Sequence, residues 1–358
     1  MTSDPFAPLL LARGPAWPNR LALAPLTNLQ SHADGTLSDD EFRWLTKRAA
    51  GGFGLVMTCA AHVQANGQGF PGQLGIWGDH QLPGLARLAE ALRAAGCVSA
   101  VQLQHSGRRA EKALTGEQPV CVWEDAETGA RALSDAEIEQ LIADFVAAAG
   151  RAEAAGFDGV ELHGAHGYLL AQFLDSSNNH RPRWGGDRQG RERALWAIIA
   201  GIRATTRPGF QLGVRLSPER FGILLADSVA LTADLLASGQ VDYVDLSLWD
   251  VLKSPEEEAY AGTRLIDHFT ALPRGATRLG VAGKLLSGAR VRACLEAGAD
   301  FVMVGRGAIL HHDFPARLRA DPDFAAIAPP VSRAYLAGEG LGPAFIDYMA
   351  SWKGFVAA

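Results

Sequence analysis

The chain has 358 residues, of which 48% are hydrophobic and 20% are charged, a balance typical of a globular protein with a large core. Its net charge of −6, without any long run of Lys and Arg, argues against a nucleic-acid partner. No stretch of about 18 apolar residues occurs, which argues against a membrane-spanning helix.

Eight short apolar runs, separated by segments with helical spacing, predict a parallel sheet covered by helices. In chain order we expect strands at Leu21–Ala24, Gly54–Cys59, Ser99–Gln104, Gly159–His163, Gln211–Leu216, Tyr243–Ser247, Arg278–Ala282 and Phe301–Val304. We expect helices at Leu82–Ala95, from the capping-box pattern at Ser134 to about Ala155, and at Arg191–Thr205, Ser228–Ser238 and Gly288–Ala297.

Eight strand–helix units favour an α/β fold of the (β/α)8 TIM-barrel type, with residues 1–358 as one domain. The alternative is an open doubly wound sheet with a small second domain, but no G-x-G-x-x-G follows the first expected strand. Two segments lie outside the repeat. We expect residues 115–131 to form a loop or small hairpin over the barrel mouth, and the chain from about residue 336 to form an extension.

The four cysteines lie far apart and form no C-x-x-C pair. This spacing predicts neither an iron–sulfur cluster nor a structural zinc site, and we assign no metal. The first eleven residues lack the positively charged segment of a signal peptide, so we expect reduced thiols and a cytoplasmic location.

Polar residues end or follow every one of the eight expected strands, and Thr27, Gln102 and Arg215 are among them. Each of these has a structural explanation, such as a turn cap or an ion pair. Active sites of such barrels are built at the carboxyl ends of the strands, however, and a merely stable barrel needs no such concentration of polar groups.

His163, His166 and Tyr168 form the densest group. Two histidines three residues apart could bind a metal ion, but no acidic or cysteine partner stands at a matching spacing nearby, and they could also be core residues. We favour a third interpretation, in which the two imidazoles hold a carbonyl, nitro or phenolate oxygen and the phenol donates a proton.

Gly283-Lys284 and Gly305-Arg306 follow the last two expected strands. Barrels commonly bind phosphate at this place, where glycine allows close approach and a cation is favourable. The alternative is that both glycines serve only as turn residues.

These segments resemble one family, the old yellow enzymes, which are FMN-containing ene-reductases related to NAD(P)H:flavin oxidoreductases. The resemblance covers about residues 17–320, and its longest motif is AGFDGVELHGAHGYLLAQFL at residues 155–174. Shorter motifs are Ala24-Pro-Leu-Thr27, Gly54-Leu-Val-Met-Thr-Cys-Ala60, Gln102-Leu-Gln-His-Ser-Gly-Arg108, Val214-Arg215-Leu-Ser-Pro218 and Ala299-Asp-Phe-Val-Met-Val-Gly305-Arg306.

The resemblance implies a non-covalently bound FMN that is reduced by NADH or NADPH. Arg215 would lie near the N1 and C2-carbonyl side of the flavin, and Gln102 would hydrogen-bond its pyrimidine edge. The flavin ring would be bordered by Pro25, Leu26, Thr27 and Ala60, and the phosphate would be held by Gly283, Gly305 and Arg306. Ala24 and Lys284 would also be cofactor-binding residues.

The implied activity is ping-pong reduction of α,β-unsaturated carbonyl or nitro compounds, with the histidines on the substrate oxygen and Tyr168 as proton donor. Two alternatives stay open: a non-redox barrel isomerase or aldolase that uses the same phosphate site, and a flavin-binding protein without turnover. The expected partners are small-molecule enones or nitro compounds. The resemblance is also compatible with a homodimer or higher homo-oligomer, since in some relatives the C-terminus reaches a neighbouring subunit's site.

Overall fold

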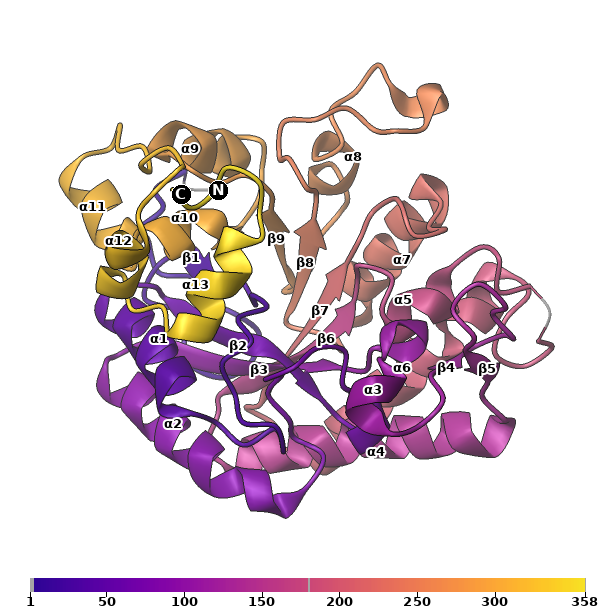
Figure 1. Ribbon diagram of the computed structural model, residues 1–358. Coiled ribbons are helices and arrows are strands. Elements are labelled where there is room, and N and C mark those ends of the chain that lie inside the picture. Colours follow the sequence, from indigo (N-terminus) through magenta and orange to yellow (C-terminus); the bar gives the residue numbers. More distant parts are fainter. Residues whose placement is uncertain (1–2, 180, 358) are drawn as a thin grey trace.

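Eight parallel strands close into a barrel in the computed structural model, which describes residues 3–179 and 181–357 (Figure 1). The ends of the predicted domain, residues 1–2 and 358, lie outside this description. The barrel order is β1-β10-β9-β8-β7-β6-β3-β2, which confirms the predicted TIM barrel. Its strands are β1 (Leu21–Leu23), β2 (Leu55–His62), β3 (Val98–Gln104), β6 (Gly159–Gly164), β7 (Gln211–Leu216), β8 (Tyr243–Ser247), β9 (Arg278–Ala282) and β10 (Phe301–Val304).

Helices cover the outside of the barrel, and their ends carry the expected caps. Ser134 accepts a hydrogen bond from the Glu137 backbone N–H, which begins α4 as a capping box. The longer helices are α1 (Asp39–Ala50), α2 (Leu82–Ala94), α4 (Asp135–Ala154), α6 (Arg188–Thr205), α7 (Leu225–Ser238) and α9 (Gly288–Glu296). The shorter ones are α3 (Lys112–Thr115), α5 (Leu169–Leu174), α8 (Asp267–Thr270), α10 (Arg306–Leu310), α11 (Phe314–Ala320), α12 (Arg333–Gly338) and α13 (Pro343–Ala350). Within the described ranges, no helix combines the length and apolar character needed to cross a membrane.

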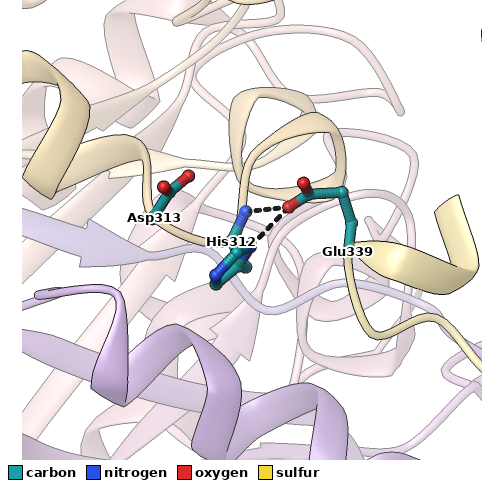
Figure 2. Close-up of side chains that lie close together, drawn as sticks. All are labelled: His312, Asp313 and Glu339. Carbon is teal, nitrogen blue, oxygen red and sulfur yellow. Dashed lines mark hydrogen bonds and ion pairs between the residues drawn. The ribbon is translucent and has the colours of Figure 1, made fainter. Parts of the chain in front are cut away.

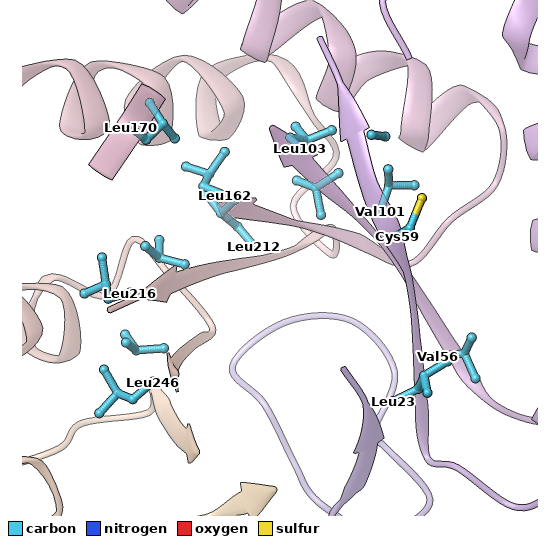
Figure 3. Close-up of a cluster of buried hydrophobic side chains, with 14 of the residues drawn as sticks. Leu23, Val56, Cys59, Val101, Leu103, Leu162, Leu170, Leu212, Leu216 and Leu246 are labelled. Atoms are coloured by element: carbon cyan, nitrogen blue, oxygen red, sulfur yellow. The ribbon is translucent and has the colours of Figure 1, made fainter. Parts of the chain in front are cut away.

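Two buried hydrophobic clusters stabilise the barrel. The larger one joins strand residues such as Leu23, Val101 and Leu162 to the surrounding helices (Figure 3). The smaller one contains Trp17, whose ring lies 5.3 Å from that of Tyr243 and 4.8 Å from that of Phe301. These two aromatic residues belong to β8 and β10, which are not neighbours in the barrel, so Trp17 closes one end of its interior.

Two elements differ from the sequence-based expectation. Strand β2 continues past Cys59 to His62, because a register shift between Met57 and Ala60 keeps it paired with β3. The excursion after β3 contains β4 (Val120–Cys121) and β5 (Arg131–Ala132), which pair in parallel rather than as the two arms of a hairpin. Only the single bridge between Asp125 and Ala130 is antiparallel, so this segment is mostly loop.

The extension from about residue 336 folds back onto the barrel beside α1, where α13 lies next to it in Figure 1. Trp44 of α1 packs edge-on against Phe345 of α13, with ring centroids 4.9 Å apart. The backbone N–H of Gly342 donates to the Gln30 side-chain oxygen at 2.7 Å. These contacts fix α13 close to the mouth of the barrel.

Candidate active site

Two adjoining cavities, of about 500 Å3 and about 660 Å3, open at the carboxyl ends of the strands. They share the lining residues Pro25, Leu26, His166, Trp249 and Trp352, so they form one continuous site. The first cavity is lined by the predicted residues Thr27, Ala60, Gln102, His163 and Tyr168. The second is lined by the predicted residues Ala24, Arg215, Gly283, Lys284, Gly305 and Arg306. The structure thus brings all the residues selected from the sequence together.

The end of β6 and the turn after it position the two histidines. His166 has a φ of 60° and Gly167 a φ of 69°, and the His166 N–H donates to the Ser217 hydroxyl at 2.9 Å. His163 Nε2 lies 2.9 Å from His166 Nδ1, and His166 Nε2 lies 2.8 Å from the Ser247 hydroxyl. The imidazoles therefore contact each other as well as the cavity, and His163 Nδ1 is buried without a hydrogen-bond partner.

Burial keeps the site's histidines neutral and its tyrosine protonated. It lowers the pKa of His163 well below the usual value and lowers the pKa of His166 to about 3, and the positive charge of Arg215 adds to both effects. Burial also raises the pKa of Tyr168. The Tyr168 hydroxyl makes no hydrogen bond with any described residue, which leaves its proton available to a bound molecule.

A different set of side chains, His312, Asp313 and Glu339, has the spacing of metal ligands (Figure 2). Their contacts have a structural explanation. Glu339 accepts hydrogen bonds at 2.6 Å from both the backbone N–H and Nδ1 of His312, while Asp313 pairs with Arg317 at 2.7 Å. This cluster joins α12 to the segment after α10.

The floor of the site holds two buried carboxyl groups beneath Gln102 and Arg215. The Gln102 amide donates to Glu161 at 2.6 Å, and Arg215 Nη1 lies 3.1 Å from Asp245. Arg215 Nε and Nη1 are nevertheless buried without a well-directed hydrogen bond. Unpartnered donors on a buried cation fit the acceptor atoms on the pyrimidine edge of a flavin. Sequence reasoning missed both carboxyl groups, whose signal was a Glu and an Asp among apolar strand residues.

The loops after β9 and β10 approach the second cavity through glycines. Gly283 has a φ of 150°, and a Cβ atom there would lie 2.8 Å from the Trp249 carbonyl carbon. Lys284 pairs with Asp250 at 3.2 Å, whereas Arg306 has no carboxylate partner among the described residues. Of the two predicted cations, Arg306 is therefore the one available to a phosphate. These residues fit the phosphate of FMN.

Several lining residues escaped sequence reasoning. Arg109 directly follows the Gln102–Arg108 motif, so its position could have been recognised. Ile309 of α10 also lines the first cavity. The others are Phe221, Trp249, Tyr348, Met349 and Trp352, which lie in loops or in the extension, and no local pattern marks them.

Comparison with known proteins shows which family this chain is similar to. The model of the NADH:flavin oxidoreductase / NADH oxidase family matches residues 6–322. The probable NADH-dependent flavin oxidoreductase YqiG of Bacillus subtilis is 32% identical over 326 residues, which cover 88% of this chain and 87% of that protein. The NADH:fumarate oxidoreductase of Klebsiella pneumoniae is 35% identical over 341 residues, which cover 89% of this chain but 36% of that much longer protein.

Solved flavin-enzyme structures also have a fold similar to that of this chain. Morphinone reductase in complex with tetrahydroNAD superimposes with a TM-score of 0.78 at 27% identity, covering 93% of this chain and 94% of that one. The old yellow enzyme homologue of Zymomonas mobilis superimposes with a TM-score of 0.79 at 25% identity, covering 96% of this chain and 99% of that one. Both likenesses extend over nearly the full length of the two proteins compared.

Proposed function

Since this chain belongs to the old yellow enzyme family of NADH:flavin oxidoreductases, which use FMN and NADH or NADPH, we propose that it reduces activated C=C bonds. The substrates would be α,β-unsaturated carbonyl or nitro compounds. NADH or NADPH and then the substrate would bind in the same cavity, one after the other. The observation that carries the proposal is one continuous site in which His163, His166 and Tyr168 lie beside the residues suited to FMN.

The chemistry that FMN supplies when bound is hydride transfer, from NADH or NADPH and then to the β-carbon of the alkene. Neutral His163 and His166 can each donate one N–H, and we propose that they hold the substrate's carbonyl or nitro oxygen. They would give up part of their mutual contact and the Ser247 contact to do so. Donors fixed at this oxygen stabilise the negative charge that develops there during reduction.

We propose that Tyr168 delivers a proton to the α-carbon. Its phenol stays protonated at neutral pH because burial raises its pKa, and the hydroxyl has no competing hydrogen bond among the described residues. Gln102 and Arg215 would orient the flavin from the floor of the site, and Arg306 would bind its phosphate.

An anaerobic spectrophotometric titration tests the proposal. The yellow colour of the FMN-loaded protein should bleach with NADH or NADPH and return on addition of 2-cyclohexenone. Bleaching without recovery by any activated alkene would support the alternative of a flavin protein without ene-reductase turnover. A protein that cannot be loaded with FMN would support the non-redox barrel alternative.

Stopped-flow measurement of the two half-reactions tests the role of Tyr168. Tyr168→Phe should slow reoxidation by the enone about 100-fold, the usual contribution of a positioned proton donor, and change reduction by NAD(P)H less than about threefold. Equal slowing of both half-reactions would contradict this role. His163→Ala should weaken the binding of 4-hydroxybenzaldehyde in the same preparation, because it removes a donor to the phenolate oxygen.

A further inference from the structure

Most of the cations that line the two cavities are neutralised by carboxylates. Five of them form ion pairs: Arg108 with Asp125, Arg215 with Asp245, Arg220 with Glu256, Lys253 with Glu219 and Lys284 with Asp250. Among the described residues, only Arg109 and Arg306 have no carboxylate partner. Arg306 lies at the suggested phosphate position in the second cavity, whereas Arg109 lies in the first cavity with the histidines.

Two neutral groups hold Arg109 in place. Its Nη1 donates to the His166 carbonyl oxygen at 2.6 Å, and its guanidinium carbon lies 4.5 Å from the centre of the Tyr168 ring. The left-handed backbone at His166, with a φ of 60°, belongs to the turn that carries both of these partners. A guanidinium has five N–H donors, and the described residues accept from only one of its nitrogens, so a free donor edge remains.

The first cavity contains no charge that would oppose an anion. None of the described residues that line it is acidic, and its two histidines are neutral. Its remaining wall is largely aromatic, formed by Phe221, Trp249, Tyr348 and Trp352. A ligand that suits this surface has a flat apolar body and one carboxylate.

We propose that Arg109 binds a carboxylate of the substrate, so that the preferred substrates are activated alkenes that carry an acid group in addition to the carbonyl held by His163 and His166. This inference rests on the proposed function and specifies its substrate class. A planar guanidinium can bind a carboxylate through two parallel hydrogen bonds, which also orients the alkene beside Tyr168.

Kinetics with trans-4-oxo-2-pentenoate and its methyl ester test the proposal, because the two enones differ in charge at the same carbon skeleton. Arg109→Gln should lower kcat/KM for the acid at least about tenfold more than for the ester, as expected for loss of a charge-assisted hydrogen bond, whereas loss of its contacts with His166 and Tyr168 affects both substrates alike. Arg109→Lys should restore part of the loss. Arg220→Gln, which removes a cavity-lining arginine that is already paired with Glu256, should affect acid and ester equally.

A binding measurement separates recognition from turnover. The saturated keto acid 4-oxopentanoate, titrated into the FMN-loaded protein by absorbance, should bind at least about tenfold more weakly to Arg109→Gln than to the wild type. Equal loss with acid and ester, or no loss in either, overturns the proposal while 2-cyclohexenone turnover persists. A rise in KM for NADPH with an unchanged KM for the acid also overturns it, because Arg109 would then bind a phosphate of the nucleotide. Loss of turnover with every alkene in the wild type would instead refute the proposed function.

Discussion

The buried carboxyl group of Glu161 should make stability depend on pH in a direction opposite to that of most surface carboxylates. Burial, with a contribution from the neighbouring Asp245, raises the pKa of Glu161 from 4.5 to about 8. Between these two values the folded state holds a proton that the unfolded state has released, so the free energy of unfolding falls as pH rises. The slope from this one group approaches at most about 1.4 kcal/mol per pH unit.

We predict that Glu161→Gln flattens this decline between about pH 5 and 8, because the amide carries no ionisable proton. The substitution keeps an oxygen that can accept the hydrogen bond from Gln102. Part of the decline should remain, since burial also raises the pKa of Asp245. Urea unfolding, followed by circular dichroism at constant ionic strength on protein with a fixed FMN content, gives the free energy of unfolding at each pH.

Glu137→Gln provides the matched control. The hydrogen bond from Arg131 lowers the pKa of Glu137 from 4.5 to about 2, so its stabilising contribution is present above pH 4.5 and is lost as pH falls toward 2. This variant should therefore lose stability and keep the wild-type slope between about pH 5 and 8. If Glu161→Gln and the wild type also run parallel over that range, Glu161 is not protonated in the folded state and the reasoning is refuted.

Three further variants test other parts of the structure. Arg306→Ala should raise the dissociation constant of FMN about 10- to 100-fold, measured by the fluorescence of released flavin. Lys284→Ala should raise it less, because Lys284 is already paired with Asp250. Equal effects of the two variants would contradict the assignment of Arg306 to the phosphate. Trp17→Ala should lower the free energy of unfolding by about 3–5 kcal/mol, because it leaves a cavity at the end of the barrel interior that Trp17 closes. A loss below about 1 kcal/mol in urea titrations would be inconsistent with that packing. Trp352→Ala, which enlarges both cavities, should raise kcat/KM for ring-fused enones several-fold and change kcat/KM for 2-cyclohexenone less than about twofold. An equal loss of kcat/KM for both kinds of substrate would contradict the inference that Trp352 limits the size of the substrate.

The strands of the barrel could be predicted because each is a short apolar run with a polar residue or glycine at its end, and most predicted bounds differ from the structure by at most one residue. The end of β2 could not, because residues 60–62 lack a strand pattern and are extended only by the bulge that keeps them against β3. Local sequence records the propensity of a segment, whereas this pairing depends on a neighbour about 40 residues away.

Part of the site could likewise be predicted from the sequence, and part could not. His163, His166 and Tyr168 lie within six residues of one another, so their proximity was readable from spacing. The pairing of Gln102 with Glu161 joins two strands that are far apart in sequence, and the placement of Tyr348 and Trp352 depends on the packing of α13 against α1. Contacts of this kind leave no periodicity in the chain.

The residues that suit the flavin and the residues near α13 that line the first cavity come from different parts of the chain. The floor of the site, which suits the flavin, is encoded by strand–loop units that also hold the barrel together, whereas Tyr348, Met349 and Trp352 come from a segment that contributes no strand to it. None of these three residues takes part in the strand pairing of the barrel, although Met349 is buried in the main hydrophobic cluster. Substitutions of Trp352, which is exposed at the rim of both cavities, can thus alter substrate choice with less effect on folding than substitutions of the buried Met349.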